Sequence, residues 1–378
     1  AESFFPGSCA AVKGGITTVM DMPPFQTVTS RAQFLKRAAL ADRECVSDFG
    51  FTGGIVIQQE DLDHLDELCA CGVSQFKVFM LSRPSDELLW QAVQTAARTG
   101  LRLAVHMEEP ALLREVDWND PLGFYKANPA EAENVAVARM LEMARAAGAA
   151  IHVCHVSSAR SAELIDQYKG WGTAVTAETT PHYLILNQKN ITAFPERAIV
   201  TPALREEHDN DVLWQALEDG VIDILVSDHF LGAAPDPAKP RPAPRDAEPG
   251  MAGLEVSMPL IYTFGVKQGK LSMQRFIQAF SLTPAFLAGV AGQKGALNPG
   301  MDADLVLFDP SNVWEVRSQA KESRIATLPY EGWQLQGAVR QTWVRGKEVW
   351  NGNEITCDAG WGCIIPKGIL ESINCMEK

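Results

Sequence analysis

The sequence lacks the features that mark membrane, secreted and disulfide-bonded proteins. None of its apolar runs approaches the ~18 residues needed to cross a bilayer, so we expect no membrane segment. Its start has neither the charged nor the apolar region of a secretion signal. Its 8 cysteines include no C-x-x-C pair, which argues against a disulfide framework and against a zinc ribbon. We therefore expect a reduced, cytoplasmic protein.

Basic charge is also scarce. Lys and Arg number 33 against 47 Asp and Glu, which gives the 378 residues a net charge of −14. Without a basic surface to displace phosphate counterions, nucleic acid is not an expected partner. The one basic cluster, at 239–245, alternates with prolines and is typical of a mobile loop. With 46% hydrophobic and 21% charged residues, the composition is that of a globular protein.

Short apolar runs alternate with longer amphipathic ones, a pattern that indicates βα units around a parallel sheet. The predicted strands are 15–21, 49–57, 75–81, 101–107, 150–156, 174–178 and 222–228. The predicted helices include 31–44, 60–70, 87–99, 131–147, 161–168 and 209–217. An open doubly wound sheet and a closed barrel both fit this alternation. The open sheet is disfavoured because the sequence has no G-x-G-x-x-G and no G-x-x-x-x-G-K motif.

Polar residues inside or at the ends of four predicted strands favour the barrel, whose catalytic groups lie at the carboxyl ends of strands. These residues are Lys77, His106, His155 and Asp228. A barrel needs eight strands, and seven are found. We therefore predict a TIM-like (β/α)₈ barrel over residues 1–295, with its first strand missing and a gap beside 15–21. From 296 to 378 short β-rich segments (303–308, 337–344, 348–350) predict a small, incomplete β-sandwich appendage followed by a tail.

Each polar strand residue has a structural interpretation beside the chemical one. Lys77 could face water from an edge strand, or it could be a buried amine that captures carbon dioxide as an anionic carbamate. His106 could be a core histidine with satisfied hydrogen bonds. Asp228 could cap a helix or close an Asx turn, or it could bind a metal. The coincidence of all four favours a metal site, with zinc preferred over manganese or iron.

His152 and His155 are three residues apart on one predicted strand. Side chains alternate between the two faces of a regular strand, so these two should point in opposite directions. We expect His155, which is nearer the carboxyl end, to face the barrel. We expect His152 to face the helices in a structural role.

The motifs together resemble those of the cyclic amidohydrolases, a group that includes allantoinase, hydantoinase/dihydropyrimidinase and dihydroorotase. The segment GGITTVMDMP at 14–23 is similar to the allantoinase form of the stretch that follows the first metal motif. Further similar segments are FKVF (76–79), VHME (105–108), CHVSS (154–158), ETTPHYL (178–184), PALR (202–205), SDH (227–229), PGMDAD (299–304) and PYEG (329–332). The resemblance covers nearly the whole chain in order.

The resemblance implies metal-dependent opening of a cyclic amide ring by a metal-activated water. Carbamylated Lys77 would bridge two zinc ions, His106 and His155 would hold one of them, and Asp228 would ligate the other and act as general acid/base. The implied substrate-binding residues are Ser82, Thr201, Pro202 and Gly250. A homo-oligomer, dimer or tetramer, is also implied.

Two features depart from the group. Its H-x-H metal pair is absent, since no H-x-H occurs in the sequence. We therefore expect an incomplete chain that holds at most one well-ordered metal, near His106 and His155, or none. Hydantoinases carry a tyrosine five residues after the lysine, where this chain has Ser82. This difference favours allantoinase over hydantoinase, dihydropyrimidinase or dihydroorotase. A non-catalytic scaffold is the rival from another class, although such relatives lose the metal ligands broadly.

Overall fold

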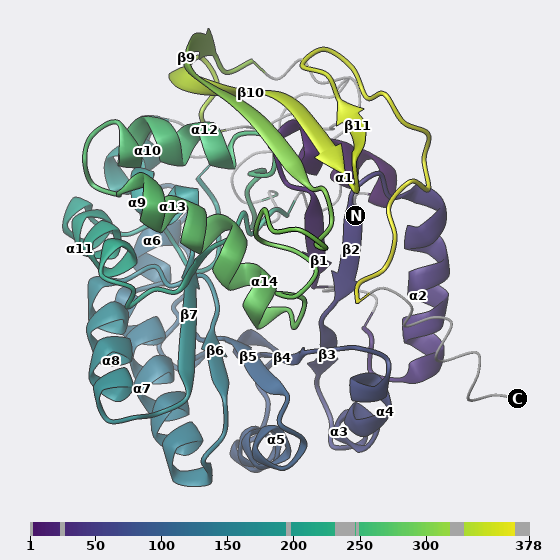
Figure 1. Ribbon diagram of the computed structural model, residues 1–378. Helices are drawn as coiled ribbons and strands as arrows, with labels where there is room; N and C mark the ends of the chain where they lie inside the picture. The colour runs from purple at the N-terminus through teal and green to yellow at the C-terminus, as the bar shows by residue number, and fades with distance from the viewer. Residues whose placement is uncertain are drawn as a thin grey trace, which may run out of the picture.

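The structure is a computed structural model that describes residues 3–22, 27–193, 198–230, 246, 249–317 and 329–366. The basic cluster at 239–245 lies outside these residues. Parallel strands alternate with helices up to residue 225, as the periodicity predicts (Figure 1). The strands are β1 (Thr18–Asp21), β2 (Asp48–Phe51), β3 (Gly53–Val56), β4 (Gln75–Phe79), β5 (Arg102–His106), β6 (Ile151–Val153), β7 (Val175–Thr179) and β8 (Ile224–Leu225).

The intervening helices follow the amphipathic segments. They are α1 (Phe4–Lys13), α2 (Arg31–Glu44), α3 (Glu60–Asp63), α4 (Leu65–Ala70), α5 (Asp86–Thr99), α6 (Gly123–Ala127), α7 (Ala130–Ala147), α8 (Ala159–Gly170), α9 (Pro181–Ile185), α10 (Gln188–Ala193) and α11 (Glu207–Glu218). Serine side chains cap three of the longer ones: Ser30, Ser85 and Ser158 accept a backbone N–H of the first turn of α2, α5 and α8. Among the described residues no helix is both long and apolar enough to span a bilayer.

The parallel strands pair in sequence order. One sheet has the order β3-β4-β5-β6-β7-β8, and β1 pairs with β2 in a separate parallel ladder. Only Thr52 separates β2 from β3, so the predicted strand 49–57 is present as two consecutive pieces. In the part of the chain that is described, no strand of either sheet pairs with the second edge of β1 or of β8. The open edge of β1 is where the sequence predicts a gap.

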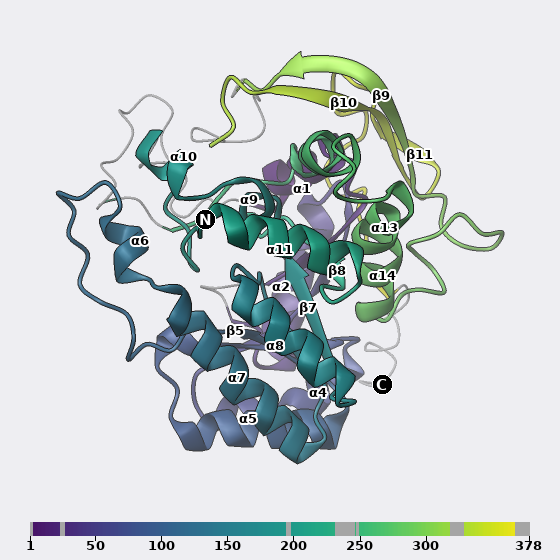
Figure 2. The ribbon, with the colours of Figure 1, turned by 90° about the vertical axis from the view of Figure 1, so that its left-hand side faces the viewer.

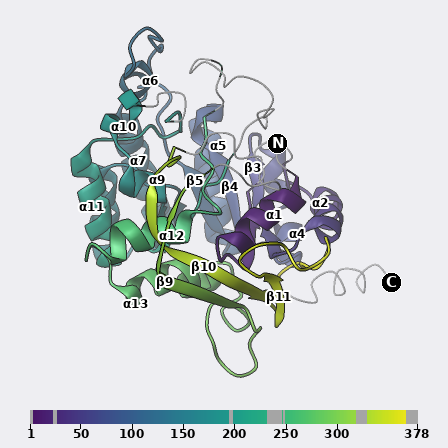
Figure 3. The ribbon, with the colours of Figure 1, turned by 90° about the horizontal axis from the view of Figure 1, so that it is seen from above.

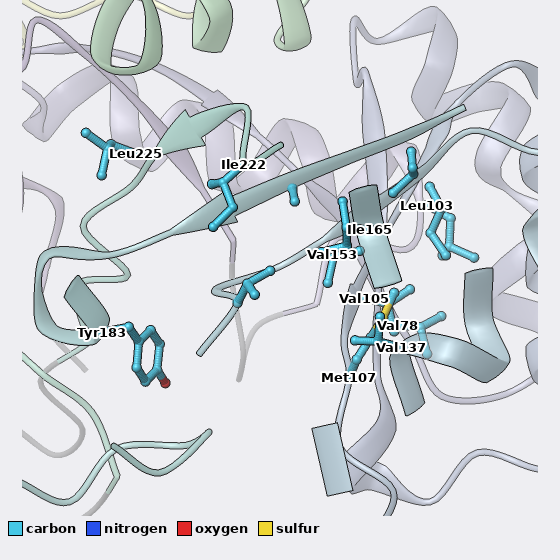
Figure 4. Packing of buried hydrophobic residues seen from close by; sticks show 14 of the residues in the cluster. Val78, Leu103, Val105, Met107, Val137, Val153, Ile165, Tyr183, Ile222 and Leu225 are labelled. Atoms are coloured by element: carbon cyan, nitrogen blue, oxygen red, sulfur yellow. The ribbon is translucent and has the colours of Figure 1, made fainter. Parts of the chain in front are cut away.

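The main core lies between these strands and the helices outside them. In Figure 4 the strand residues Val105 and Val153 lie near Val137 of α7 and Ile165 of α8, and all four are buried. Helices α7 and α8 pack against each other, as Figure 2 shows from the side. Because the apolar faces of the helices cover the outside of the strands, the polar strand residues are left for the opposite face.

After β8 the chain forms two helical segments and then a separate antiparallel sheet. The first is α12 (Ser257–Ile261), continued by the π-helical turn Tyr262–Val266. The second is α13 (Met273–Ile277) and α14 (Thr283–Leu287), joined by the π-helical turn Gln278–Leu282. The sheet has the order β11-β10-β9, from β9 (Leu305–Glu315), β10 (Gln334–Val344) and β11 (Lys347–Trp350). Seen from above, β10 runs beside α12 (Figure 3). The β-rich segments are therefore present where the sequence predicts them, and a domain boundary at residue 296 stays a prediction.

A buried ion cluster joins β2 to the segment that precedes β9. The amino group of Lys294 contacts Asp48 of β2 and lies 2.9 Å from both Asp302 and Asp304. The guanidinium of Arg345, in the turn between β10 and β11, also contacts Asp48. Lys294 thus lies between three carboxylates. It links the β1–β2 ladder to the segment that leads into the antiparallel sheet.

Candidate active site

Lys77 lies on the same face of the sheet as certain residues of the neighbouring strands. In the parallel register Lys77 is the partner of Ala104 in β5. Ala104 is in turn the partner of His152 in β6, and His152 is that of Thr176 in β7. Register partners in a parallel sheet point to the same face, so Lys77 and His152 lie on one face. The expectation that His152 points toward the helices is wrong.

Three further polar residues lie two positions along from these partners and therefore on the same face. They are His106 of β5, Cys154 just after β6, and Glu178 of β7. Together with Lys77 and His152 they form what we call the polar face. All five side chains are buried. Five buried polar residues on adjoining strands indicate a site rather than a core, because polar groups are costly to bury.

Lys77 is buried and not at a water-facing edge. Only 4% of its surface is exposed, and its strand β4 has a neighbour on each side. Its amino group donates a hydrogen bond to the Cys154 sulfur at 2.9 Å. This placement excludes the surface interpretation of Lys77 and leaves the chemical one.

The structure brings His106 and His155 together. Nδ1 of His106 lies 3.0 Å from Nε2 of His155, and Nε2 of His106 lies 2.8 Å from a Glu108 carboxylate oxygen. Strand alternation alone would direct His155 away from the polar face. It reaches His106 because β6 ends at Val153 and His155 has a φ of +37°. Such a backbone conformation is strained in a residue with a side chain and often marks functional sites.

Burial disfavours the charged form of both histidines. It lowers the pKa of His106, although the neighbouring Glu108 opposes this effect. It lowers the pKa of His155 well below the usual value, and the nearby His106 and Lys77 lower it further. A neutral imidazole has the lone pair that a metal ion requires. In addition, Nδ1 of His155 is buried without a hydrogen-bond partner among the described residues.

Asp228 follows β8 and shares the strained geometry of His155, with a φ of +45°. Burial of its carboxyl raises its pKa to about 6. The charge of Glu178 contributes to this rise, whereas the charges of Lys77 and His229 oppose it. Asp228 is therefore within electrostatic reach of the polar face. The structure thus brings His106 and His155 together on the side of the sheet that carries Lys77, and Asp228 lies within electrostatic reach of Lys77 and Glu178.

The predicted substrate-binding residues lie on loops at the carboxyl ends of strands. Ser82 is exposed at the end of the short 3₁₀ turn Met80–Ser82, which follows β4. The Gly250 N–H donates to the Ile199 carbonyl at 2.9 Å, which places the Gly250 segment beside the one leading to Thr201 and Pro202.

The Gly250 segment also adjoins Asp228. Its next residue, Met251, forms a parallel bridge with His229. The Pro202 carbonyl is held by the Tyr183 hydroxyl, which donates to it at 2.6 Å. Gly250 thus lies on a segment that adjoins Asp228. Thr201 and Pro202 lie on the segment that is hydrogen-bonded to Gly250.

Sequence reasoning missed Cys154, Glu178 and Glu108 as members of the site. Glu178 ends a predicted strand, so the rule that selected Asp228 would also have selected it. Glu108 is fully buried against His106. Cys154 gives no comparable signal, because a lone cysteine on a strand is usually a small core residue.

Comparison with known proteins agrees with this arrangement. Residues 1–349 match the model of the Amidohydrolase family. The fold and the polar face are consistent with this match. The chain belongs to the Amidohydrolase family.

Among its relatives, an allantoinase from Streptomyces avermitilis is 34% identical over 370 residues, 94% of this chain and 81% of that protein. A D-phenylhydantoinase from Escherichia coli is 29% identical over 376 residues, covering 96% and 82%. Among solved structures, an L-hydantoinase (dihydropyrimidinase) from Arthrobacter aurescens is 30% identical with a TM-score of 0.86. The match covers 96% of this chain and 83% of that one.

Proposed function

We propose that this protein hydrolyses the amide bond of a small cyclic substrate and so opens its ring. The observation that carries the proposal is the contact of His106 with His155, 3.0 Å apart, beside buried Lys77 at the ends of neighbouring strands. Family membership supports the reaction class. We also propose that the parallel strands form a TIM-like barrel, to which the consecutive pairing from β3 to β8 lends support.

The residues present fit one zinc ion. His106 and His155 offer neutral imidazoles, and a carbamate on Lys77 would add a carboxylate-type oxygen, which makes three protein ligands of the kind zinc prefers. The buried, unpartnered Nδ1 of His155 leaves a donor without a role in the fold among the described residues. When bound, zinc supplies Lewis-acid polarisation of a carbonyl and lowers the pKa of water. A second ion would have Asp228 and the carbamate but no H-x-H pair, since the sequence has none.

Asp228 is the proposed proton carrier. Hydrolysis of a ring amide requires a base to take a proton from water and an acid to give one to the departing nitrogen. One carboxylate oxygen of Asp228 could do both in turn, since the residue lies at the strand end where its charge interacts with Lys77 and Glu178. Ser82, Thr201, Pro202 and Gly250 are proposed to contact the ring from the adjoining loops.

Allantoin is the proposed first substrate, and hydantoin is the second. The allantoinase relative is somewhat more similar than the D-phenylhydantoinase, at 34% against 29% identity. Ser82 also stands where the resemblance places a tyrosine in hydantoinases. Dihydropyrimidinase and dihydroorotase activities are further alternatives. The solved structures with similar folds include hydantoinases, which keeps that alternative open.

A hydrolysis screen tests the proposal. The zinc-loaded protein is offered allantoin, hydantoin, dihydrouracil and dihydroorotate, and ring opening is followed for each. We expect turnover of allantoin above the others. Preferred turnover of hydantoin would establish the alternative, and turnover of none would support the scaffold interpretation.

The setting of this enzyme is also a proposal. We propose a cytoplasmic homo-oligomer that acts on a small molecule. The free thiols of Cys45, Cys69, Cys71, Cys154, Cys357 and Cys363 suit a reducing compartment. Light scattering of the purified protein would give its subunit number.

A further inference from the structure

The polar face holds a second set of potential metal ligands that the proposed reaction does not use. A ring nitrogen of His152, the sulfur of Cys154 and a carboxylate oxygen of Glu178 all lie within 4.8 Å of one another. All three residues are buried. We propose that this triad, His152–Cys154–Glu178, binds a thiophilic divalent cation such as Zn²⁺ or Cd²⁺. It shares no ligand with the His106–His155 position, and it does not depend on the hydrolytic activity.

The donor set of the triad suits such an ion. One imidazole, one thiolate and one carboxylate make three protein ligands and leave a fourth position open, as in catalytic zinc sites. The thiolate favours soft or borderline ions over magnesium and calcium, which prefer oxygen. Zinc–ligand distances of about 2.0–2.3 Å place the ligand atoms of a tetrahedral site about 3.3–3.8 Å apart. The ligand atoms, which lie within 4.8 Å of one another, therefore need to approach by about 1.5 Å at most.

Second contacts already orient two of the ligands. Nδ1 of His152 lies 2.9 Å from the Thr176 hydroxyl, and Nε2–H of the same ring donates to Glu178. Binding of the ion would displace the proton on Nε2, and the Thr176 hydroxyl is placed to accept a proton from Nδ1. Nε2 and the nearer Glu178 oxygen are 3.0 Å apart. The other oxygen of Glu178 accepts the backbone N–H of His155 at 3.3 Å. Partners of this kind fix the orientation of metal-binding histidines and carboxylates.

Lys77 competes with the ion for this position. Its amino group is 2.9 Å from the Cys154 sulfur, and its positive charge acts on both Cys154 and Glu178. A divalent ion at the triad would replace this contact and would be repelled by the same charge. Removing the charge of Lys77 should therefore strengthen binding at the triad, whereas it should weaken binding at a site that uses Lys77 as a ligand. The effect of a Lys77 substitution on metal affinity therefore distinguishes binding at the triad from binding at the His106–His155 position.

The test is a Cd²⁺ titration of the chelator-treated 378-residue chain without added bicarbonate. Binding is followed by the ultraviolet thiolate-to-cadmium absorption and by calorimetry. We expect one thiolate-bound ion in the unmodified chain. Cys154→Ser should abolish the absorption, and Glu178→Gln should weaken binding by about 10-fold or more. Lys77→Met should bind Cd²⁺ more tightly with the same absorption.

Cys71→Ser is the matched control, because Cys71 is also a buried free thiol but lies before β4, at the other end of that strand from the site. It should leave the absorption unchanged. Thermal melting of each variant confirms folding, and if Cys154→Ser does not fold, Glu178→Gln decides the question. Absorption that persists in Cys154→Ser would overturn the proposal. So would weaker binding in Lys77→Met, undiminished affinity in Glu178→Gln, or the absence of any thiolate absorption in the unmodified chain.

Discussion

Asp228 is the residue on which the proposed proton transfer depends. An amide at this position keeps the size of the side chain but cannot take up the proton. We therefore expect Asp228→Asn to lower the ring-opening rate by ~10²–10⁴-fold, with a melting temperature close to that of the unmodified protein. Steady-state kinetics beside thermal melting measures both. Turnover retained by the asparagine variant would remove Asp228 from the mechanism.

Lys77 makes a second prediction at this scale. If its buried amine is carbamylated, gentle intact-mass measurement should find the mass of one carbon dioxide added to the chain. Lys77→Ala should lose this mass and the zinc held at the His106–His155 position, and short carboxylic acids should restore part of that zinc by replacing the carbamate. Lys126→Ala is the control, since Lys126 is an exposed lysine paired with Asp120. An added mass that survives in Lys77→Ala would place the modification elsewhere.

The histidines show how far sequence reasoning reaches at the scale of single residues. His106, at the end of an apolar strand, could be assigned from its position alone. His155 does lie beside His106, as its position near the strand end suggests, but the strand-alternation argument fails for it and for His152. The positive φ of His155, which turns its side chain toward His106, has no signature in the local sequence. The partners of His152, Thr176 and Glu178, come from another strand and required the register of the sheet.

At the scale of elements, the strand that carries Lys77 depends on a close approach by β3. Gly54 of β3 is the register partner of Lys77. An added Cβ at Gly54 would lie 2.8 Å from the Lys77 carbonyl oxygen, and Gly54 has a φ of +100°. Gly54→Ala should therefore lower the free energy of unfolding by about 1–3 kcal/mol. It should also slow ring opening by displacing Lys77.

Gly100→Ala is the comparison for this prediction. Gly100 also has a positive φ, +74°, but an added Cβ there would meet nothing within 4 Å. It should therefore cost less stability and leave the rate unchanged. Denaturant unfolding compares the two variants, and equal losses would mean that the contact with Lys77 is unimportant.

The existence and order of the strands and helices could be predicted because buried parallel strands are almost entirely apolar. Their bounds could not. The predicted strand 222–228 is reduced to Ile224–Leu225, since the chain turns away at Asp228 with its positive φ. Likewise, the predicted strand 49–57 is divided at Thr52, where the chain passes from the ladder with β1 to the ladder with β4.

At the scale of the whole molecule, Lys294 connects strand β2 to the segment that precedes the antiparallel sheet. Its side chain is 4% exposed, and Asp48 is fully buried. Lys294→Met would leave buried Asp48 with Arg345 alone and would remove the cation that Asp302 and Asp304 share, which should lower the free energy of unfolding by up to about 3–5 kcal/mol. Arg98→Met, which breaks an exposed pair with Asp66, should cost no more than about 1 kcal/mol. Denaturant unfolding of both variants tests the difference, and a small loss for Lys294→Met would show that the cluster adds little stability.

The most direct test of the central claim is zinc reconstitution. The chelator-treated protein receives increasing zinc while ring opening of allantoin, or of the best substrate from the screen, is measured together with zinc content. The account predicts that activity disappears on chelation and returns with the zinc that binds at the His106–His155 position. It also predicts that His155→Ala binds about one zinc fewer per chain and recovers no activity. Activity that survives complete metal removal, or that returns equally in His155→Ala, would contradict the account.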